Sequence, residues 1–317
     1  MKYLIVGTGA VGATIGAFLL NTGKDVSFIS RGKQLERLIT QGLAINSDMI
    51  GDKTFKNIKA YSQNDFAGKA DIIFVCVKSY SIDEIAPLIE KASHEKTLVI
   101  PILNTFETGK KLAQTVKTPV MFDGCIYVVS EIENTGAIKQ TTNIFKIVFG
   151  RIDKKELPEN AIKELRKDLN EAKIESVFVD DINSAKFAKF SLTSAFACCG
   201  AYYDLEAKDF QQQGKYRTTV TEMLNEMKTL SKAMKLDIKV DIISESLKII
   251  DKFNPTATAS MQRDLKSKGQ AQSEMSGLLF DVIKLSKKYN VKMPHYEEIA
   301  KKFSNKEDIV SAEVLAT

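Results

Sequence analysis

The sequence of 317 residues is poor in the side chains that build metal centres and covalent cross-links. It contains two histidines and four cysteines, and no pair of the cysteines has CxxC spacing. Cys198 and Cys199 are adjacent, and adjacent cysteines do not readily pair with each other. We therefore expect neither a zinc site nor a disulfide framework.

Long apolar runs and basic blocks are also missing. No stretch reaches the length of a membrane span, and the opening apolar run reads as a strand inside a fold motif rather than a signal peptide. The net charge of +5 is spread along the chain, so we predict no nucleic-acid partner. A protein of the cytoplasm, without membrane or metal partners, is the expectation.

A glycine-rich turn near the start of the chain is the most informative segment. Residues 3–6 form an apolar run typical of a buried parallel strand, and GTGAVG at 7–12 follows at once in GxGxxG spacing. Residues 10–20 continue as an apolar helix and residues 25–30 as a second strand. The order strand, glycine turn, helix, strand predicts a Rossmann-type βαβ unit; the alternative is a tight turn without a ligand.

Each glycine of this turn has a distinct predicted role. Gly7 allows the tight turn, Gly9 lets the backbone approach a pyrophosphate, and Gly12 lets the helix lie close to the strand. The amide groups and positive dipole end of the helix then face the diphosphate. The predicted cofactor contacts of the turn are Gly7, Thr8, Gly9, Ala10, Val11 and Gly12.

The residue that closes the second strand indicates which dinucleotide binds. Sites for NAD place an acidic residue there, whereas this chain has Arg31, with no acidic residue between Val26 and Leu35. A guanidinium group suits a 2′-phosphate, so we predict NADPH as the cofactor. The alternative is a solvated surface arginine.

The rest of the chain predicts an α/β fold with two domains. Apolar strands and helices alternate up to about residue 180, with antiparallel strands predicted between Cys125 and Phe149; long helical patterns follow. We therefore predict a doubly wound NADP-binding domain over 1–180 and an all-helical substrate and dimerisation domain over 181–317. Lys78 and Asn104 directly follow predicted strands, on the sheet edge where such folds bind ligands.

One helix of the second domain carries two candidate catalytic lysines. Lys186, Lys189 and Thr193 lie at three- and four-residue spacing within an otherwise apolar segment, 184–199. A lysine shielded from water on such a helix can pass a proton to a developing alkoxide. The alternative is a lysine that extends to the surface, and the spacing leaves open which lysine points inward.

With these segments placed, the chain resembles the ketopantoate reductases over almost its full length. The matching segments are GTGAVG at 7–12, Arg31-Gly32, CVK at 76–78, Asn104, FAK at 187–189 and SMQRD at 260–264. The resemblance implies a Rossmann domain that binds NADPH, a helical domain, and a substrate in the cleft between them. It further implies that Lys189 is catalytic, that Lys78 and Asn104 contact cofactor and substrate, and that Ser260 holds the substrate.

Several positions depart from the family pattern. Thr193 and Ala197 stand where the family has asparagines, with Thr193 as a substituted substrate contact. Three further departures are Phe187 in place of tryptophan, Thr105 in place of glycine, and Ala271 or Gln272 in place of a glutamate. Glu274 takes that glutamate's role only if the helix register slips. The cofactor half of the pattern is intact, whereas the substrate half has changed.

The resemblance implies NADPH-dependent reduction of 2-dehydropantoate to pantoate, a step of pantothenate biosynthesis. The alternatives are a related reductase of a different 2-oxo acid and a noncatalytic NADP-binding protein. The small-molecule partner is then a 2-oxo acid. The amphipathic segment 219–234 is also compatible with a homodimer.

Overall fold

The computed structural model describes residues 1–304, so the last part of the predicted helical domain, residues 305–317, lies outside the described residues. The chain forms two compact units. Unit 1 comprises Met1–Leu103 and Glu107–Lys186, and unit 2 comprises Asn104–Phe106 and the chain from Phe187 onward. The short segment Asn104–Phe106 therefore belongs to the helical unit although it lies within the sequence of the first domain.

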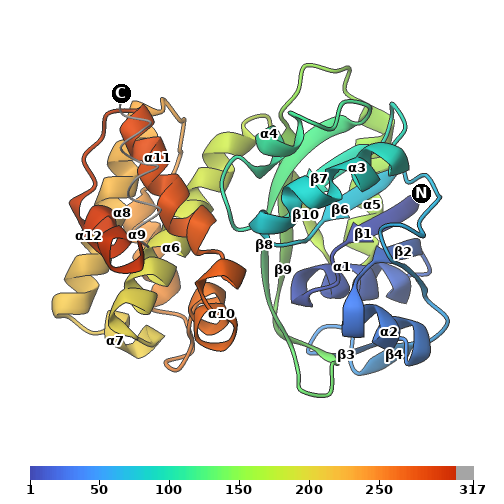
Figure 1. Ribbon diagram of the computed structural model, residues 1–317, viewed down its shortest axis with the longest axis horizontal. Helices are drawn as coiled ribbons and strands as arrows, with labels where there is room; N and C mark the ends of the chain where they lie inside the picture. Colours follow the sequence, from blue (N-terminus) through green and yellow to red (C-terminus); the bar gives the residue numbers. More distant parts are fainter. Residues whose placement is uncertain (305–317) are drawn as a thin grey trace. The chain divides into compact units, whose positions relative to one another are not determined.

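Unit 1 is built on a ten-stranded sheet with the order β4-β3-β9-β8-β7-β6-β1-β2-β5, and β10 pairs with β9 (Figure 1). The strands β5, β2, β1, β6, β7 and β8 are parallel neighbours, while β8 and β9 are antiparallel. The strands are β1 (Lys2–Val6), β2 (Asp25–Ile29), β3 (Leu43–Ser47), β4 (Lys53–Phe55), β5 (Lys59–Tyr61), β6 (Ile72–Val75), β7 (Leu98–Pro101), β8 (Val120–Ile132), β9 (Ile138–Arg151) and β10 (Glu175–Phe178).

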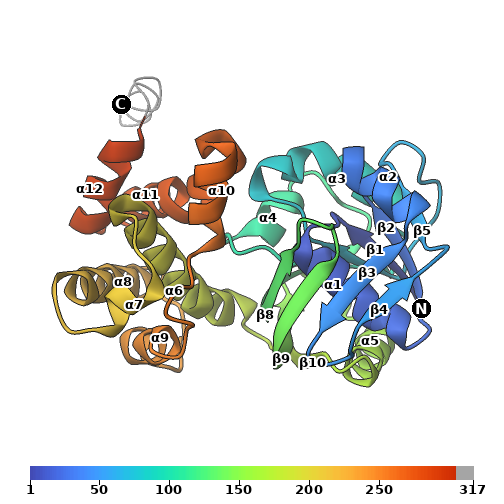
Figure 2. The ribbon, with the colours of Figure 1, turned by 90° about the horizontal axis from the view of Figure 1, so that it is seen from below.

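Helices cover both faces of this sheet (Figure 2). Alternate residues of β1 point to opposite sides: Tyr3 and Ile5 join a core with α1 and α5, and Leu4 and Val6 join a core with α3 and α4. Because both faces are buried, the central strands are continuous apolar runs. The helices of this unit are α1 (Ala10–Asn21), α2 (Gly32–Thr40), α3 (Ile82–Ala92), α4 (Thr108–Leu112) and α5 (Glu159–Glu171).

The antiparallel hairpin predicted between Cys125 and Phe149 is present, and its chain reverses near Gly136, which has a φ of 84°. The first strand, β8, is longer than predicted because it runs through Gly124 without a break. A Cβ at Gly124 would lie 2.9 Å from Ile102 Cδ1, so the glycine here permits close packing rather than a turn.

The contact between α1 and β2 depends on the absence of a side chain at Gly16. A Cβ at this position would lie 2.2 Å from Cε1 of Phe28, a fully buried ring. Gly16→Ala is therefore expected to lower the free energy of unfolding by about 1–3 kcal/mol through overpacking, measured by urea denaturation. The double variant Gly16→Ala/Phe28→Leu should recover part of the loss, and a single variant as stable as the parent protein would contradict this packing.

Unit 2 is helical. Its helices are α6 (Ile182–Tyr203, which begins in unit 1), α7 (Ala207–Gln211), α8 (Lys215–Ala233), α9 (Ile242–Ile250), α10 (Ser260–Lys268), α11 (Asp281–Lys288) and α12 (Pro294–Phe303). The apolar side of α8 (Val220, Met223, Leu224, Met227 and Leu230) is fully buried in the core of this unit. Because this face of α8 is buried within its own unit, it gives no support to a homodimer, although the amphipathic pattern of the segment is compatible with one.

The prediction of an α/β fold with an N-terminal doubly wound sheet and a helical C-terminal region is confirmed. Among the described helices, none combines the length and the apolar character needed to cross a bilayer. Within the same part of the chain, no group of three His, Cys, Asp or Glu side chains is arranged to hold a metal ion.

Candidate functional site

The glycine turn between β1 and α1 has the backbone that the sequence predicts. Gly7 has a φ of 98°, which favours glycine, and its amide donates to Ile29 O at 3.0 Å. A Cβ at Gly12 would lie 2.0 Å from Gly7 O, so this glycine is needed for the helix to start where it does. A Cβ at Gly9, in contrast, would have no atom of residues 1–304 within 4 Å apart from its chain neighbours. Protein atoms therefore fill the space beside Gly7 and Gly12, whereas the space beside Gly9 is open.

The first turn of α1 is suited to an anion. Gly9 is its N-cap residue, no side chain caps the helix, and its first turn contains no acidic residue. Thr8, a predicted contact, is buried, and its hydroxyl lies 2.5 Å from the Ser30 hydroxyl at the end of β2. Thr8 thus ties the turn to the neighbouring strand end.

Arg31 lies directly after β2 and forms the N-cap position of α2. Its Nη1 is 3.1 Å from Oε2 of Glu84, and the two side chains are 72% and 49% exposed. An ion pair this exposed contributes little stability, so the guanidinium is available to an anionic ligand.

Lys78 follows β6 at the same sheet edge, and Cys76 stands just before it. Lys78 is half-buried and precedes the short 3₁₀ turn Ser79–Ser81. Desolvation raises the pKa of the Cys76 thiol well above its ordinary value, so this cysteine remains protonated at neutral pH. Burial likewise raises the pKa of Cys199 to about 12. Neither of these two environments activates a thiolate.

In unit 2 the structure brings Lys189 and Asn104 together. The Lys189 ammonium donates to Asn104 Oδ1 at 3.2 Å, and both side chains are half-buried. Phe106 places the segment that carries Asn104, because its ring packs against Phe187 at 5.1 Å and against Phe190 at 5.8 Å between centroids. Phe187, the aromatic residue two positions before Lys189, therefore holds this segment against α6.

Lys186 has a different environment in unit 1. Its ammonium group lies 2.5 Å from Oδ1 of Asp123 on β8, and both side chains are 3% exposed. A buried lysine paired in this way is held in a fixed position. Of the two lysines that the sequence left open, Lys186 is therefore the buried one and Lys189 the half-buried one.

Thr193 and Ser260, the other predicted substrate contacts, lie in unit 2. The Thr193 hydroxyl donates to the Lys189 carbonyl at 3.1 Å, four residues back along α6. Ser260 is half-buried and is the first residue of α10. Arg263, on the same helix, donates to the backbone carbonyl of Thr258 at 2.5 Å. Arg263 therefore secures the entry to α10.

Two departures from the family pattern have a structural explanation. Ala197 is fully buried in the helical core, where an asparagine would need a hydrogen-bond partner. Glu274 is buried, whereas Ala271 and Gln272 are exposed, and the π-helical turn Ser276–Phe280 follows it. A π turn takes up an additional residue, which shifts the register of the residues before it. Glu274 is thus the buried carboxylate of this segment.

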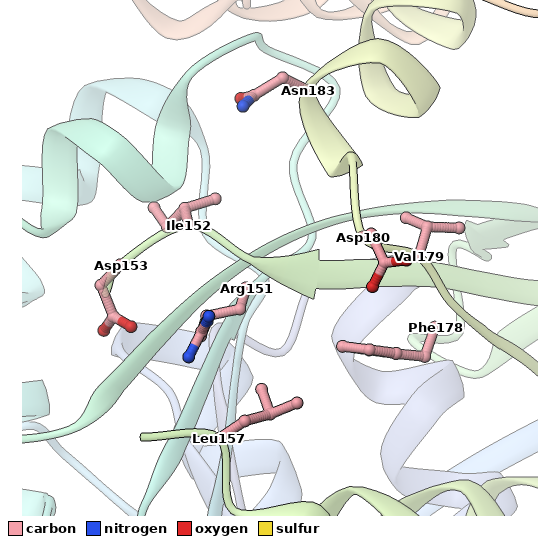
Figure 3. A pocket seen from close by; sticks show the side chains of 8 residues that line it. All are labelled: Arg151, Ile152, Asp153, Leu157, Phe178, Val179, Asp180 and Asn183. Carbon is pink, nitrogen blue, oxygen red and sulfur yellow. The ribbon is translucent and has the colours of Figure 1, made fainter. Parts of the chain in front are cut away.

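A pocket of about 280 Å³ lies elsewhere in unit 1 and is lined by none of the predicted site residues (Figure 3). Its polar side chains include Arg151, Asp153 and Asp180. Arg151 donates to the carbonyl of Lys155, and Asp153 accepts from the amide of Met121 at 2.7 Å. Because two of these groups stabilise the surrounding loop, the glycine turn and the Lys189–Asn104 pair remain the candidate functional site.

Sequence reasoning missed Phe106 and Asp123. Phe106 lies just before the helix α4, which begins at Thr108, and belongs to unit 2. Asp123 lies within the apolar strand β8 and is itself 2% exposed. A single carboxylate inside a buried strand requires a partner, so the position of Asp123 within an apolar run could have indicated a buried ion pair.

Comparison with known proteins gives the same assignment for both units. Residues 3–154 match the family described as ketopantoate reductase PanE/ApbA, and residues 181–307 match its C-terminal counterpart. A 2-dehydropantoate 2-reductase of Aquifex aeolicus is 23% identical over 308 residues, 97% of each chain.

Solved structures show the same fold. A 2-dehydropantoate 2-reductase from Methylococcus capsulatus matches with a TM-score of 0.82, 22% identity and 96% coverage of both chains. A ternary structure of D-mandelate dehydrogenase with NADH and anilino(oxo)acetate has a TM-score of 0.85 and 19% identity, and covers 95% of this chain and 96% of that one. The two family matches together span nearly all of the sheet and the helices. The chain belongs to the ketopantoate reductase family, whose members are oxidoreductases that act on the C=O or CH–OH group of 2-oxo acids.

Proposed function

We propose that this protein is an NADPH-dependent reductase that converts 2-dehydropantoate to pantoate, a step of pantothenate biosynthesis. The observation that carries the proposal is the Lys189–Asn104 hydrogen bond of 3.2 Å in a chain that also has a complete GxGxxG turn. A protein that retains the cofactor turn alone would not need an oriented, half-buried lysine. This observation favours the reductase over the noncatalytic NADP-binding protein.

The residues of the glycine turn fit a dinucleotide. The open space at Gly9 and the uncapped start of α1 leave room and amide donors for a pyrophosphate. In this proposal the cofactor is held by residues Gly7 to Gly12, Arg31, Lys78 and Asn104. When bound, the reduced nicotinamide supplies a hydride to the carbonyl carbon of the substrate.

Lys189 performs the proton chemistry in this proposal. Its ammonium group polarises the carbonyl oxygen of the 2-oxo acid and donates the proton that completes the alcohol. Asn104 orients that group, because its Oδ1 accepts from the Lys189 ammonium. Ser260 contributes a hydroxyl to the substrate, and Thr193 contacts the substrate at the position of the family's asparagine.

Arg31 is proposed to select NADPH over NADH. Arg31→Ala is expected to raise the Kd for NADPH by about 10- to 100-fold, the equivalent of a hydrogen bond to a charged group of about 1.5–3 kcal/mol. The Kd for NADH should change little, since NADH has no 2′-phosphate, and this makes NADH the internal control. Fluorescence titration measures both. An equal loss for the two cofactors would assign Arg31 a role unrelated to the phosphate.

A second candidate substrate follows from the changed positions of α6. Thr193 and Ala197 stand where the family pattern has asparagines, which favours a 2-oxo acid other than 2-dehydropantoate. The likeness to a D-mandelate dehydrogenase fold is compatible with this candidate. In both cases the reaction at Lys189 is the same, and only the group attached to the oxo acid differs.

The test is NADPH oxidation against a panel of 2-oxo acids that includes 2-dehydropantoate and benzoylformate. Turnover that is fastest with 2-dehydropantoate supports the first substrate, and faster turnover of another member supports the second. NADPH binding without turnover of any member would overturn the reductase and leave a cofactor-binding protein.

A further inference from the structure

The chain passes between its two compact units at three places. It leaves unit 1 after Leu103, returns at Glu107, and leaves it again after Lys186. The segment beyond the first crossing carries Asn104, and the segment beyond the last carries Lys189, three residues after Lys186. The chain thus connects each residue of the proposed catalytic pair to a neighbouring segment of unit 1.

Both ends contact one carboxylate in unit 1. Asp123 Oδ1 lies 2.5 Å from Lys186 Nζ, and Oδ2 accepts from the Gly109 amide at 3.1 Å. Gly109 lies two residues after Glu107, the first residue after the chain returns. The amide of Gly124 also donates to Oδ1, at 2.8 Å, so the carboxylate cannot rotate freely.

The surrounding backbone is shaped to bring both segments to this carboxylate. A Cβ at Gly109 would lie 2.5 Å from Phe122 O and 3.0 Å from Asp123 Cβ, so only glycine allows α4 to approach β8 this closely. Gly150, paired with Asp123 across the sheet, has the same role for α6: a Cβ there would lie 3.0 Å from Ile182 Cβ.

We propose that Asp123 is a positioning residue of the reductase, which fixes through Lys186 and Gly109 the two segments that carry Lys189 and Asn104. Three hydrogen bonds and two stretches of covalent chain together form a closed loop. The hydrogen bonds join Asp123 to Lys186, Lys189 to Asn104, and Gly109 to Asp123. The chain connects Lys186 to Lys189 along α6, and Asn104 to Gly109. Release of Asp123 leaves both ends of the Lys189–Asn104 pair free to shift. This inference rests on the proposed function.

The decisive variant is the double substitution Asp123→Asn/Lys186→Met, which removes both buried charges together and avoids leaving one unpaired. We expect kcat to fall by about 10- to 100-fold, as for a catalytic group displaced by a fraction of an ångström, with the Kd for NADPH and the KM changed much less. Gly109→Ala disturbs the other contact of the same carboxylate and should also lower kcat.

The matched control is the double substitution Lys24→Met/Asp168→Asn. It removes another largely buried pair of unit 1, with an N–O distance of 2.6 Å and side chains 19% and 8% exposed. This control should lower Tm while kcat, measured well below the transition, stays at the parent value. If Asp123→Asn/Lys186→Met also retains kcat when folded, the positioning role is overturned, although the reductase function stands.

A second readout does not require turnover. A lysine-directed acylating reagent labels Lys189 at a rate that depends on its hydrogen bond to Asn104, and mass spectrometry reads that rate residue by residue. We expect the rate at Lys189 to change several-fold in Asp123→Asn/Lys186→Met and to be unchanged in the control. A changed rate in a protein without turnover would support the positioning role and overturn the proposed function; an unchanged rate would overturn the positioning role.

Discussion

Lys189→Met is expected to lower kcat by about 10²- to 10⁴-fold, the contribution typical of a positioned general acid. Methionine is an unbranched side chain of similar length, so it fills the same space beside Asn104 but cannot polarise an oxygen or donate a proton. The Kd for NADPH should stay close to that of the parent protein, because Lys189 is not among the residues proposed to hold the cofactor. Steady-state kinetics with the best substrate of the panel and fluorescence titration measure the two quantities.

Lys248→Met is the control for this substitution. Lys248 lies on α9 with its side chain 66% exposed and pairs with Glu245 at 2.7 Å, so its loss removes a surface charge only. Its kcat should equal that of the parent protein. If Lys189→Met keeps more than about a tenth of the parent kcat, an effect below the range of general acid catalysis, Lys189 is not the acid.

Gly9→Ala is expected to weaken NADPH binding on the order of 100-fold without destabilising the protein. Among the described residues, a Cβ at Gly9 meets no atom within 4 Å beyond its chain neighbours, and the φ of −66° at Gly9 is accessible to alanine. The added methyl group instead occupies the space through which a pyrophosphate would approach the backbone. Isothermal titration gives the affinity, and thermal unfolding of the cofactor-free protein gives the stability.

Gly12→Ala provides the contrast. Its Cβ would lie 2.0 Å from Gly7 O, so this substitution should lower Tm as well as cofactor affinity. Comparison of the two variants therefore distinguishes a glycine required for cofactor binding from a glycine required for packing within the protein. Unchanged NADPH affinity in Gly9→Ala would show that the diphosphate does not lie against this turn.

The parts of the fold that could be predicted are those with local signals. The run at residues 3–6, the glycines of 7–12 and the strand at 25–30 are adjacent in sequence, and their spacing alone defines the βαβ unit. The antiparallel strands between Cys125 and Phe149 were recognisable for the same reason. Each of these elements depends on neighbours a few residues away.

The choice between Lys186 and Lys189 could not be made in this way. The two lysines are three residues apart on one helix, and their partners, Asp123 and Asn104, are 63 and 85 residues away in the chain. Helical periodicity places both on similar faces, and only the tertiary contacts separate the buried ion pair from the half-buried hydrogen bond. The burial of Glu274 and the π turn at Ser276–Phe280 that follows it likewise have no local signal in the sequence.

The packing of Phe106 between the rings of α6 has a consequence for synthesis on the ribosome. Asn104 leaves the ribosome 85 residues before Lys189, which corresponds to several seconds at about 5–20 residues per second. During that interval the neighbouring Phe106 lacks its aromatic partners on α6, while the preceding strands of the sheet have already been synthesised. The contacts of Phe106 with Phe187 and Phe190 form only after α6 has emerged, and a fragment that begins at Phe187 would lack one ring of this cluster.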